Sequence, residues 1–211
     1  MKWLGCLGVL VVLALVVGGV VVGKYNSLVG LGQGVDAQWA QVENQYQRRA
    51  DLVPNLVATV KGAADFEKST LEEVVKARAS VGQTTIDPKN LPNDPAAMAK
   101  YQQAQDQLSS ALSRLLVVVE RYPELKANAN FRDLQTQLEG TENRVSVERM
   151  RFNEKAQAYN TERLRFPTVI FANLLGMKEK AYFQATPGSQ QPPDVKFNFG
   201  ASPSPAPAER R

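Results

Sequence analysis

Side chains that commonly do chemistry in enzymes are scarce in this sequence. It contains no histidine, and its single cysteine, Cys6, lies in an apolar run near the N-terminus. This excludes histidine-based triads, zinc sites with imidazole ligands and the Glu-x-x-His pairs of di-iron bundles. The sequence also lacks a G-x-x-x-x-G-K-S/T loop and a strand followed by G-x-G-x-x-G. We therefore predict no catalytic, cofactor-binding or metal-binding residue, and we expect that the chain is not an enzyme.

Carboxylates are the remaining groups that could transfer protons. Candidates among the glutamates are Glu120, Glu124, Glu139, Glu142 and Glu148. Carboxylate pairs act in acid–base catalysis only when they are buried and close together, and on amphipathic helices they usually form a solvated face. Glu142 is the exception, because it flanks an apolar helical face beside Thr141 and could meet Arg49. The conservative interpretation is an internal polar layer with a structural role.

Arg49 belongs to the segment QYQRRADLVPNL, residues 45–56, which places charges inside an apolar helical pattern. From Tyr25 to Val60 the pattern recurs at alternating steps of three and four residues, as in a helical bundle or coiled coil, and Arg49 occupies one of its positions. Two interpretations stay open. The arginine stem packs while its guanidinium reaches water, or the guanidinium forms a buried ion pair with a carboxylate on a facing helix and fixes register.

The same pattern continues through Pro54 without a change of phase. Asp51 is a suitable N-cap that would place Pro54 in the first turn of a new helix. We predict one long helix kinked at Pro54, or two nearly collinear helices. Glycines at positions 30, 32 and 34 either form a flexible collar or are tolerated within this helix.

Residues 3–22 form an apolar run without a charge, and a helix of that length is about 30 Å long, which matches a hydrocarbon core. The run is longer than the apolar region of a cleaved signal peptide, and no Ala-x-Ala-like site follows it. We predict that residues 1–23 are a transmembrane signal anchor, which crosses the cell membrane once and contacts the lipid bilayer through residues 3–22. By the positive-inside rule, Lys2 and the N-terminal amine weakly favour a cytoplasmic N-terminus with the domain outside, but with Lys24 on the other flank and so short a tail the side of the soluble domain stays undecided.

The net charge of +4 is spread along the chain, so we predict no binding of nucleic acid. Gly19 and Gly23 form a G-x-x-x-G spacing that permits close approach of membrane helices, so a homo-oligomer is one possibility.

The segment after Val60 continues the helical pattern to about residue 80, with Gly62 as a candidate break. Turn residues and three prolines make residues 81–95 a loop. Asp94 followed by Pro95 then begins a helix that ends in the segment RYPEL.

Asn128 or Asn130 caps a further helix, which reaches about residue 164. A short apolar helix follows between Pro167 and Gly176. Residues 187–211 are rich in proline, and this composition predicts a disordered tail. The predicted fold is all-α, with an N-terminal transmembrane helix followed by an antiparallel bundle of three long helices plus a short one.

Six segments of the chain resemble the LemA family: YNSLV, VDAQWAQVENQYQRRADLVPNLVATVKG, LLVVVERYPELKANANFRDLQTQLEGTENRV, RFNEKAQAYN, RFPTVIFANLLGM and AYF. The resemblance covers residues 24–186, which we take as a LemA-like helical bundle. It implies a bacterial membrane protein with an all-α antiparallel bundle and does not imply an enzyme. Proteins that look like this are commonly drawn with the bundle in the cytoplasm, opposite to what the few flanking lysines indicate.

The leading hypothesis is a membrane-tethered helical-bundle scaffold or interaction protein with an unidentified protein partner. A lateral membrane-organising protein is one alternative, and an enzyme that uses glutamate and arginine without histidine is another. The segments that carry the resemblance supply the candidate structural or interaction residues: Trp39, Arg48, Arg49, Asp51, Pro54, Asn55, Glu142, Asn143, Arg144, Asn153, Tyr159 and Asn160.

Overall fold

The structure is a computed structural model that describes residues 2–62, 66–82 and 88–185. Within these ranges the chain is helical and contains no strand, which confirms the all-α fold. The elements are α1 (Lys2–Lys61), α2 (Lys68–Gly82), the 3₁₀ helix η1 (Pro88–Asn93), α3 (Pro95–Val119), α4 (Pro123–Ala127), α5 (Ala129–Leu164) and α6 (Thr168–Leu174). The predicted tail, residues 187–211, lies outside the described residues.

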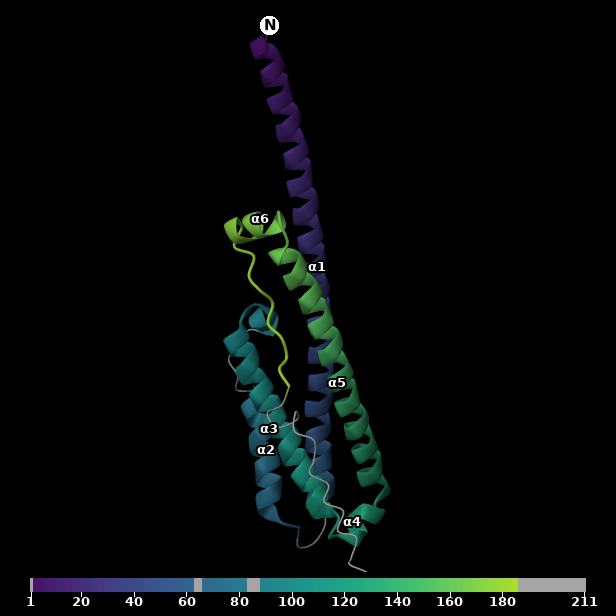
Figure 1. Cartoon of the computed structure of the whole chain (residues 1–211). Coiled ribbons are helices and arrows are strands. Elements are labelled where there is room, and N and C mark those ends of the chain that lie inside the picture. The colour runs from purple at the N-terminus through teal and green to yellow at the C-terminus, as the bar shows by residue number, and fades with distance from the viewer. Residues whose placement is uncertain (1, 63–65, 83–87, 186–211) are drawn as a thin grey trace, which may run out of the picture.

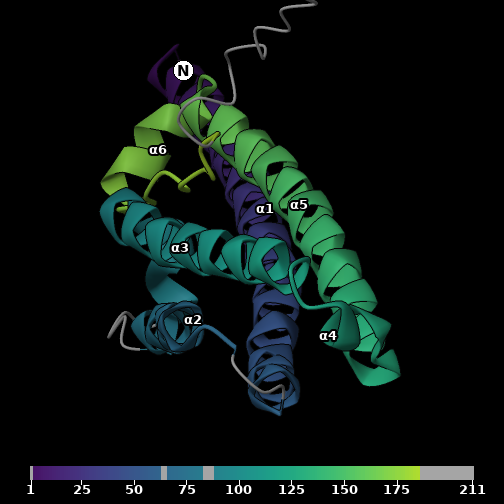
Figure 2. The same ribbon diagram turned by 90° about the horizontal axis from the view of Figure 1, so that it is seen from below.

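The four longest helices form two antiparallel pairs. Helix α1 lies against α5 along most of the bundle, and α2 lies against α3 (Figure 1). Seen from below, α2 and α3 lie to one side of the α1–α5 pair, and α3 runs at an angle to α1 and α5 (Figure 2). Short α4 closes the bottom of the bundle, and α6 lies across the end from which α1 emerges (Figure 1).

Two details of this arrangement differ from the prediction. The first long helix ends at Lys61, so the region after the candidate break at Gly62 is a separate antiparallel helix. In addition, Pro123 does not only end a helix. Because a proline at the first helical position loses no hydrogen bond, it also begins α4, which sequence reasoning missed.

The predicted helix starts are confirmed where capping residues carry them. The Asp94 side chain accepts hydrogen bonds from the amides of Ala96 and Ala97, with Pro95 at the first helical position. Asn128, rather than Asn130, caps α5 by accepting from the amide of Phe131. These side chains satisfy amide groups that have no partner within the helix.

Pro54 lies inside α1, on its solvent-exposed side, and Asp51 is an interior residue of this helix rather than its cap. A proline has no amide hydrogen, so the carbonyl of Ala50, four residues earlier, loses its helical donor. Arg78 of α2 replaces that donor, with Nε 3.0 Å from the Ala50 oxygen. One continuous helix therefore tolerates Pro54 because the neighbouring helix satisfies the exposed carbonyl.

The buried side chains form two apolar clusters that follow each other along α1. The first, which we call the upper cluster, contains Leu28 to Tyr46 of α1 with residues of α3, α5 and α6. The second, the lower cluster, contains Val53 to Val60 of α1 with residues of α2, α3, α4 and α5. The predicted pattern of α1 is thus the buried face of that helix, and Arg49 falls between the two clusters.

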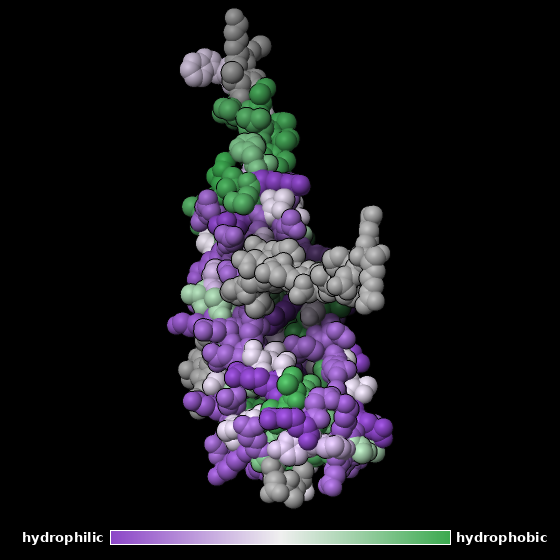
Figure 3. Space-filling model, turned by 60° about the horizontal axis from the view of Figure 1, so that its bottom comes forward, coloured by the Kyte–Doolittle hydropathy of each residue, from purple (hydrophilic) through white to green (hydrophobic). Residues whose placement is uncertain are grey.

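Beyond the bundle, α1 continues toward the N-terminus as a single protruding rod. Within the described residues it is the one helix long and apolar enough to cross a membrane, and none of its apolar window is buried. Figure 3 shows the hydrophobic residues of this rod above a largely hydrophilic bundle surface. The N-terminal helix could therefore span a membrane.

Glycines 30, 32 and 34 lie within α1, so they form no break between the rod and the bundle. We expect Gly34→Ala to raise the free energy of unfolding by about 0.5–1 kcal/mol, because an added Cβ meets no atom within 4 Å and alanine favours the helix. Denaturant unfolding of the detergent-solubilised chain measures this. Gly176→Ala is the control and should lower stability, because Gly176 has a φ of 65°. A loss of stability in Gly34→Ala would contradict the prediction.

Candidate functional site

Arg49 is completely buried and lies at the centre of a polar layer between the two apolar clusters. Its Nη1 donates to Glu142 Oε2 at 2.7 Å and to Ser109 Oγ at 2.6 Å. Its Nη2 donates to the side-chain and main-chain oxygens of Gln105. Ser109 also donates to Glu142 Oε1 at 2.9 Å. Of the two arrangements considered for Arg49, the structure shows the ion pair with a carboxylate on another helix.

The Arg49 layer joins the two helical pairs of the bundle. Arg49 and Glu142 lie on α1 and α5, whereas Gln105 and Ser109 lie on α3. A buried charge is costly unless it is paired and hydrogen-bonded, and the planar fork of arginine serves several acceptors at once. Both terminal nitrogens of Arg49 have acceptors, whereas its Nε and the Nε2 of Gln105 are buried without a partner among the described residues. Because the Glu142 side chain is 45% exposed, water screens the ion pair and limits its contribution to net stability.

A second arginine continues the polar layer toward the upper cluster. Arg149 donates to the hydroxyl of Tyr46 and pairs with Asp106 at 3.1 Å. The guanidinium carbon of Arg49 lies 5.3 Å from the centroid of the Tyr46 ring, and that of Arg149 lies 5.4 Å from it. Burial raises the pKa of Tyr46 above its ordinary value of 10.0, so the hydroxyl stays protonated while its oxygen accepts from Arg149.

Trp39 centres an aromatic group directly above this layer. Its ring meets Tyr101 and Phe152 edge to face, with centroids 5.9 and 5.7 Å away, and stacks on Phe183 at 6.0 Å. Arg149 also lies 5.0 Å from the centroid of the Phe183 ring. The aromatic group thus brings α1, α3, α5 and the segment after α6 together in one contact.

That segment, residues 177–185, is extended and runs back along the bundle from α6 (Figure 1). Three amide side chains hold it, and each bonds both main-chain groups of one residue. Asn160 holds Lys180 at 2.8 and 2.9 Å. Asn153 holds Phe183 at 3.0 and 2.9 Å. Gln102 of α3 holds Gln184 at 2.7 and 3.0 Å.

Side-chain contacts reinforce these amide clamps. Ala181 and Phe183 are buried in the upper cluster, and the amide of Ala181 donates to the carbonyl of Pro92 at 2.8 Å. Lys180 reaches Asp36 of α1 at 2.8 Å, and its Nζ lies 5.6 Å from the centroid of the Tyr159 ring. The bundle therefore holds an extended polypeptide by both its main chain and its side chains.

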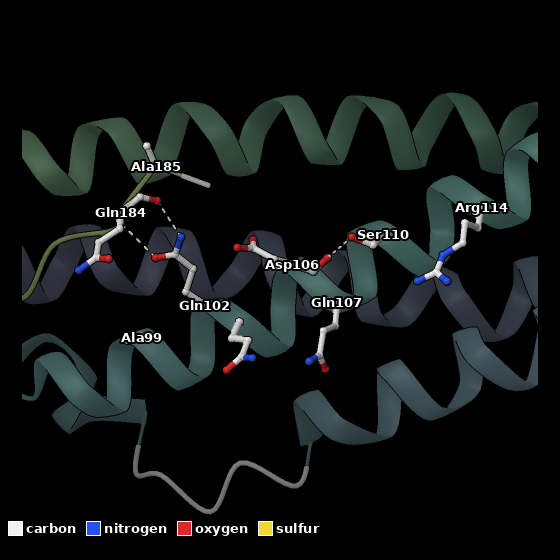
Figure 4. A pocket seen from close by; sticks show the side chains of 9 residues that line it. Ala99, Gln102, Asp106, Gln107, Ser110, Arg114, Gln184 and Ala185 are labelled. Carbon is white, nitrogen blue, oxygen red and sulfur yellow. Dashed lines mark hydrogen bonds between the residues drawn. The ribbon is translucent and has the colours of Figure 1, made fainter. Parts of the chain in front are cut away.

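Where the segment reaches Ala185, a groove of about 510 Å³ follows one side of α3. Figure 4 shows Gln102 bonded to Gln184 at one end of the groove, and Gln107, Ser110 and Arg114 farther along α3. Gln103 and Gln107 are exposed there, and their side chains make no hydrogen bond within the described part of the chain. The groove thus offers amide donors and acceptors next to the held segment.

The structure divides the sequence-based candidates into two sets. Six lie in the core layers described above: Trp39, Arg49, Glu142, Asn153, Tyr159 and Asn160. The other six, Arg48, Asp51, Pro54, Asn55, Asn143 and Arg144, are exposed and do not meet them. Asp51 there accepts a hydrogen bond from Gln47 of its own helix at 2.8 Å.

Sequence reasoning missed several partners in the site: Gln102, Gln105, Asp106, Ser109 and Arg149. Gln105 carried a usable signal, because it is a polar residue at an apolar position of its helix, as Arg49 is. The others gave none. Among residues 2–62, 66–82 and 88–185 there is also no group of three or more His, Cys, Asp or Glu side chains suited to holding a metal ion.

We expect Arg49→Ala to lower the free energy of unfolding by about 2–4 kcal/mol, because it leaves a cavity and removes the partner of buried Gln105. Arg48→Ala is the matched control, and its exposed side chain should matter by less than about 0.5 kcal/mol. Chemical denaturation of both detergent-solubilised variants tests this. Equal midpoints would show that Arg49 does not hold the layer together.

We expect Asn153→Asp to release the extended segment. A carboxylate still accepts from the amide of Phe183 but cannot donate to its carbonyl, and the two oxygens repel each other. Amide hydrogen exchange in residues 180–184 should become about tenfold faster, the effect of losing one hydrogen bond of about 1.4 kcal/mol. Asn143→Asp, an exposed site on the same helix, should leave it unchanged. Unaltered exchange in Asn153→Asp would refute the clamp.

A model of the LemA family matches residues 38–197 of this chain. Magnetosome protein MamQ of Magnetospirillum gryphiswaldense is 27% identical over 184 residues, which cover 80% of this chain and 68% of that protein. Magnetosome protein MamQ 1 of Paramagnetospirillum magneticum is 26% identical over 192 residues, with the same coverage. Protein LemA of Metamycoplasma hominis is 23% identical over 167 residues, which cover 79% of this chain and 72% of that protein. Since the family model matches more than half of its length, the chain belongs to the LemA family.

Proposed function

We propose that the chain is a membrane-tethered helical-bundle scaffold that binds an extended segment of a protein partner. The observation that carries this proposal is the set of amide clamps on residues 180, 183 and 184. Main-chain hydrogen bonds supply affinity for an extended peptide whatever its sequence, while pockets for individual side chains supply selectivity. The bundle uses both kinds of contact on its own residues 177–185.

The partner segment binds in the groove along α3, next to Ala185 of the held segment. Gln103 and Gln107 lie four residues apart on α3, so their side chains project from one face of the helix. Each amide carries both a donor and an acceptor, as Gln102 does in its bonds to Gln184. A strand that enters beside Ala185 would thus meet the same chemistry as the chain's own segment.

The tether supports a scaffold role because the apolar rod and the bundle share one helix. Helix α1 runs without interruption from its exposed apolar end to Lys61, one residue beyond Val60 of the lower cluster. In our proposal residues 3–22 of this helix span the membrane once. The groove is then presented at a fixed distance from the bilayer, since no flexible linker separates the two. No catalytic step belongs to this function.

We expect a photo-crosslinking amino acid at Gln107, in the full-length chain in its native cells, to capture one partner through one extended segment. The same residue at Gln41, an exposed amide position on α1 outside the groove, should not capture it. Mass spectrometry identifies the captured segment, and a synthetic peptide of its sequence should suppress the crosslink. Adducts only to the chain's own residues after 185, or equal adducts from both positions, would overturn the proposal.

A further inference from the structure

Helix α6 and its flanking residues expose a set of large apolar side chains, which we call the α6 patch. Phe166 is 81% exposed and Leu174 is 84% exposed. The patch also contains Leu164, Ile170 and Leu175. Ile170 and Leu174 are four residues apart in α6 and share a face of the helix, whereas Thr168 and Ala172 are buried against the bundle. Phe166 precedes the helix. Clustered apolar side chains of this size on a surface mark an interaction site.

The position of the patch indicates what covers it. Helix α6 contacts both α1 and α5 and lies crosswise to α1 at the end of the bundle (Figure 1). Lys24 pairs with Glu162 at 2.8 Å, which ties the end of α5 to the first charged residue after the apolar run of α1. The hydrogen bond from Lys24 lowers the pKa of Glu162 and keeps that carboxyl ionised. The patch therefore starts at the level where the apolar run ends.

The distance to the apolar run is short. Lys24 follows residue 22 by two positions, so about 3 Å of helix rise separates them. Helices that lie in the plane of a membrane bury their apolar face by roughly 5–10 Å at the boundary between headgroups and acyl chains. An element at the level of Lys24 and crosswise to α1 meets that boundary whenever residues 3–22 span the bilayer.

The residues around the patch suit a lipid surface. Arg165 and Lys178 are exposed beside it, and Arg163 lies on the adjoining turn. Basic side chains that flank an apolar face attract anionic headgroups while their stems stay in contact with apolar groups. The one nearly buried carboxylate nearby, Glu162, is paired with Lys24 and Arg165. Glu179 is an exposed carboxylate next to Lys178, so among the described residues the rim carries three basic side chains against one free acidic one. Lipid therefore meets apolar groups at the centre and net positive charge at the rim.

We propose that α6 docks into the headgroup region of the bilayer that α1 spans and so gives the bundle a second membrane contact. This inference rests on the proposed tether. One crossing helix leaves a domain free to tilt and to rotate about the helix axis. A second contact at the side of α1 fixes both, so the groove along α3 keeps one orientation to the membrane.

The test uses the full-length chain with Cys6→Ser, in liposomes that contain anionic lipid. Single cysteines replace Leu174, Val12 or Val117 and carry a nitroxide label. Oxygen dissolves in the bilayer and a nickel chelate stays in water, so their relaxation effects on the label report its depth. Val117 is exposed on α3 and serves as the matched water-facing control. We expect Leu174 to be several-fold more accessible to oxygen relative to nickel than Val117, and Ile170→Glu to abolish that difference.

The three positions separate the possible failures. A bilayer-like signal at Val12 with a water-like signal at Leu174 overturns the docking of α6 and leaves the tether intact. Water-like signals at both positions overturn the tether and the docking together. Protection of Leu174 from both reagents, with spin–spin broadening, would show that a second copy of the chain covers the patch instead of lipid.

Discussion

One buried guanidinium sets the alignment of the whole bundle. Arg49 lies where two apolar clusters meet, and its donors point at Glu142 of α5 and at Gln105 and Ser109 of α3. Apolar side chains tolerate a slide of one helix along another, because contacts between them have little directional preference. A guanidinium group, whose donors point in fixed directions, does not tolerate such a slide, since the slide would leave a charge in the interior without its partners. The layer thereby favours the register in which the donors of Arg49 meet their acceptors.

The register has a direct consequence for the segment after α6. Asn153 and Asn160 are seven residues apart on α5, which is a rise of about 10 Å along the helix. The residues they hold, Lys180 and Phe183, are three apart, and three residues of extended chain also cover about 10 Å. The helix and the extended segment therefore advance by equal lengths over this stretch. Gln102 completes the match from α3, which the Arg49 layer aligns with α5.

The sequence predicts much of this fold because the decisive signals are local. Asp94 with Pro95, Asn128 and Gly176 mark helix ends by capping chemistry that involves only neighbouring residues, and the apolar spacing marks the buried face of α1. Arg49 was identifiable because it interrupts that spacing, and Glu142 because it flanks a similar face. The amide clamps and the bond from Arg78 to Ala50 were not predictable. Their partners are main-chain groups far away in sequence, and main-chain groups look alike at every residue.

The replacement of the donor missing at Pro54 also orders events during synthesis. The Ala50 carbonyl receives its substitute from Arg78, which the ribosome adds only after the whole of α1 has been made. Until then that turn depends on water for its hydrogen bond, and the part of α1 beyond it is free to bend. The last turns of α1, from Asp51 to Lys61, therefore gain a fixed direction only when α2 folds back onto them.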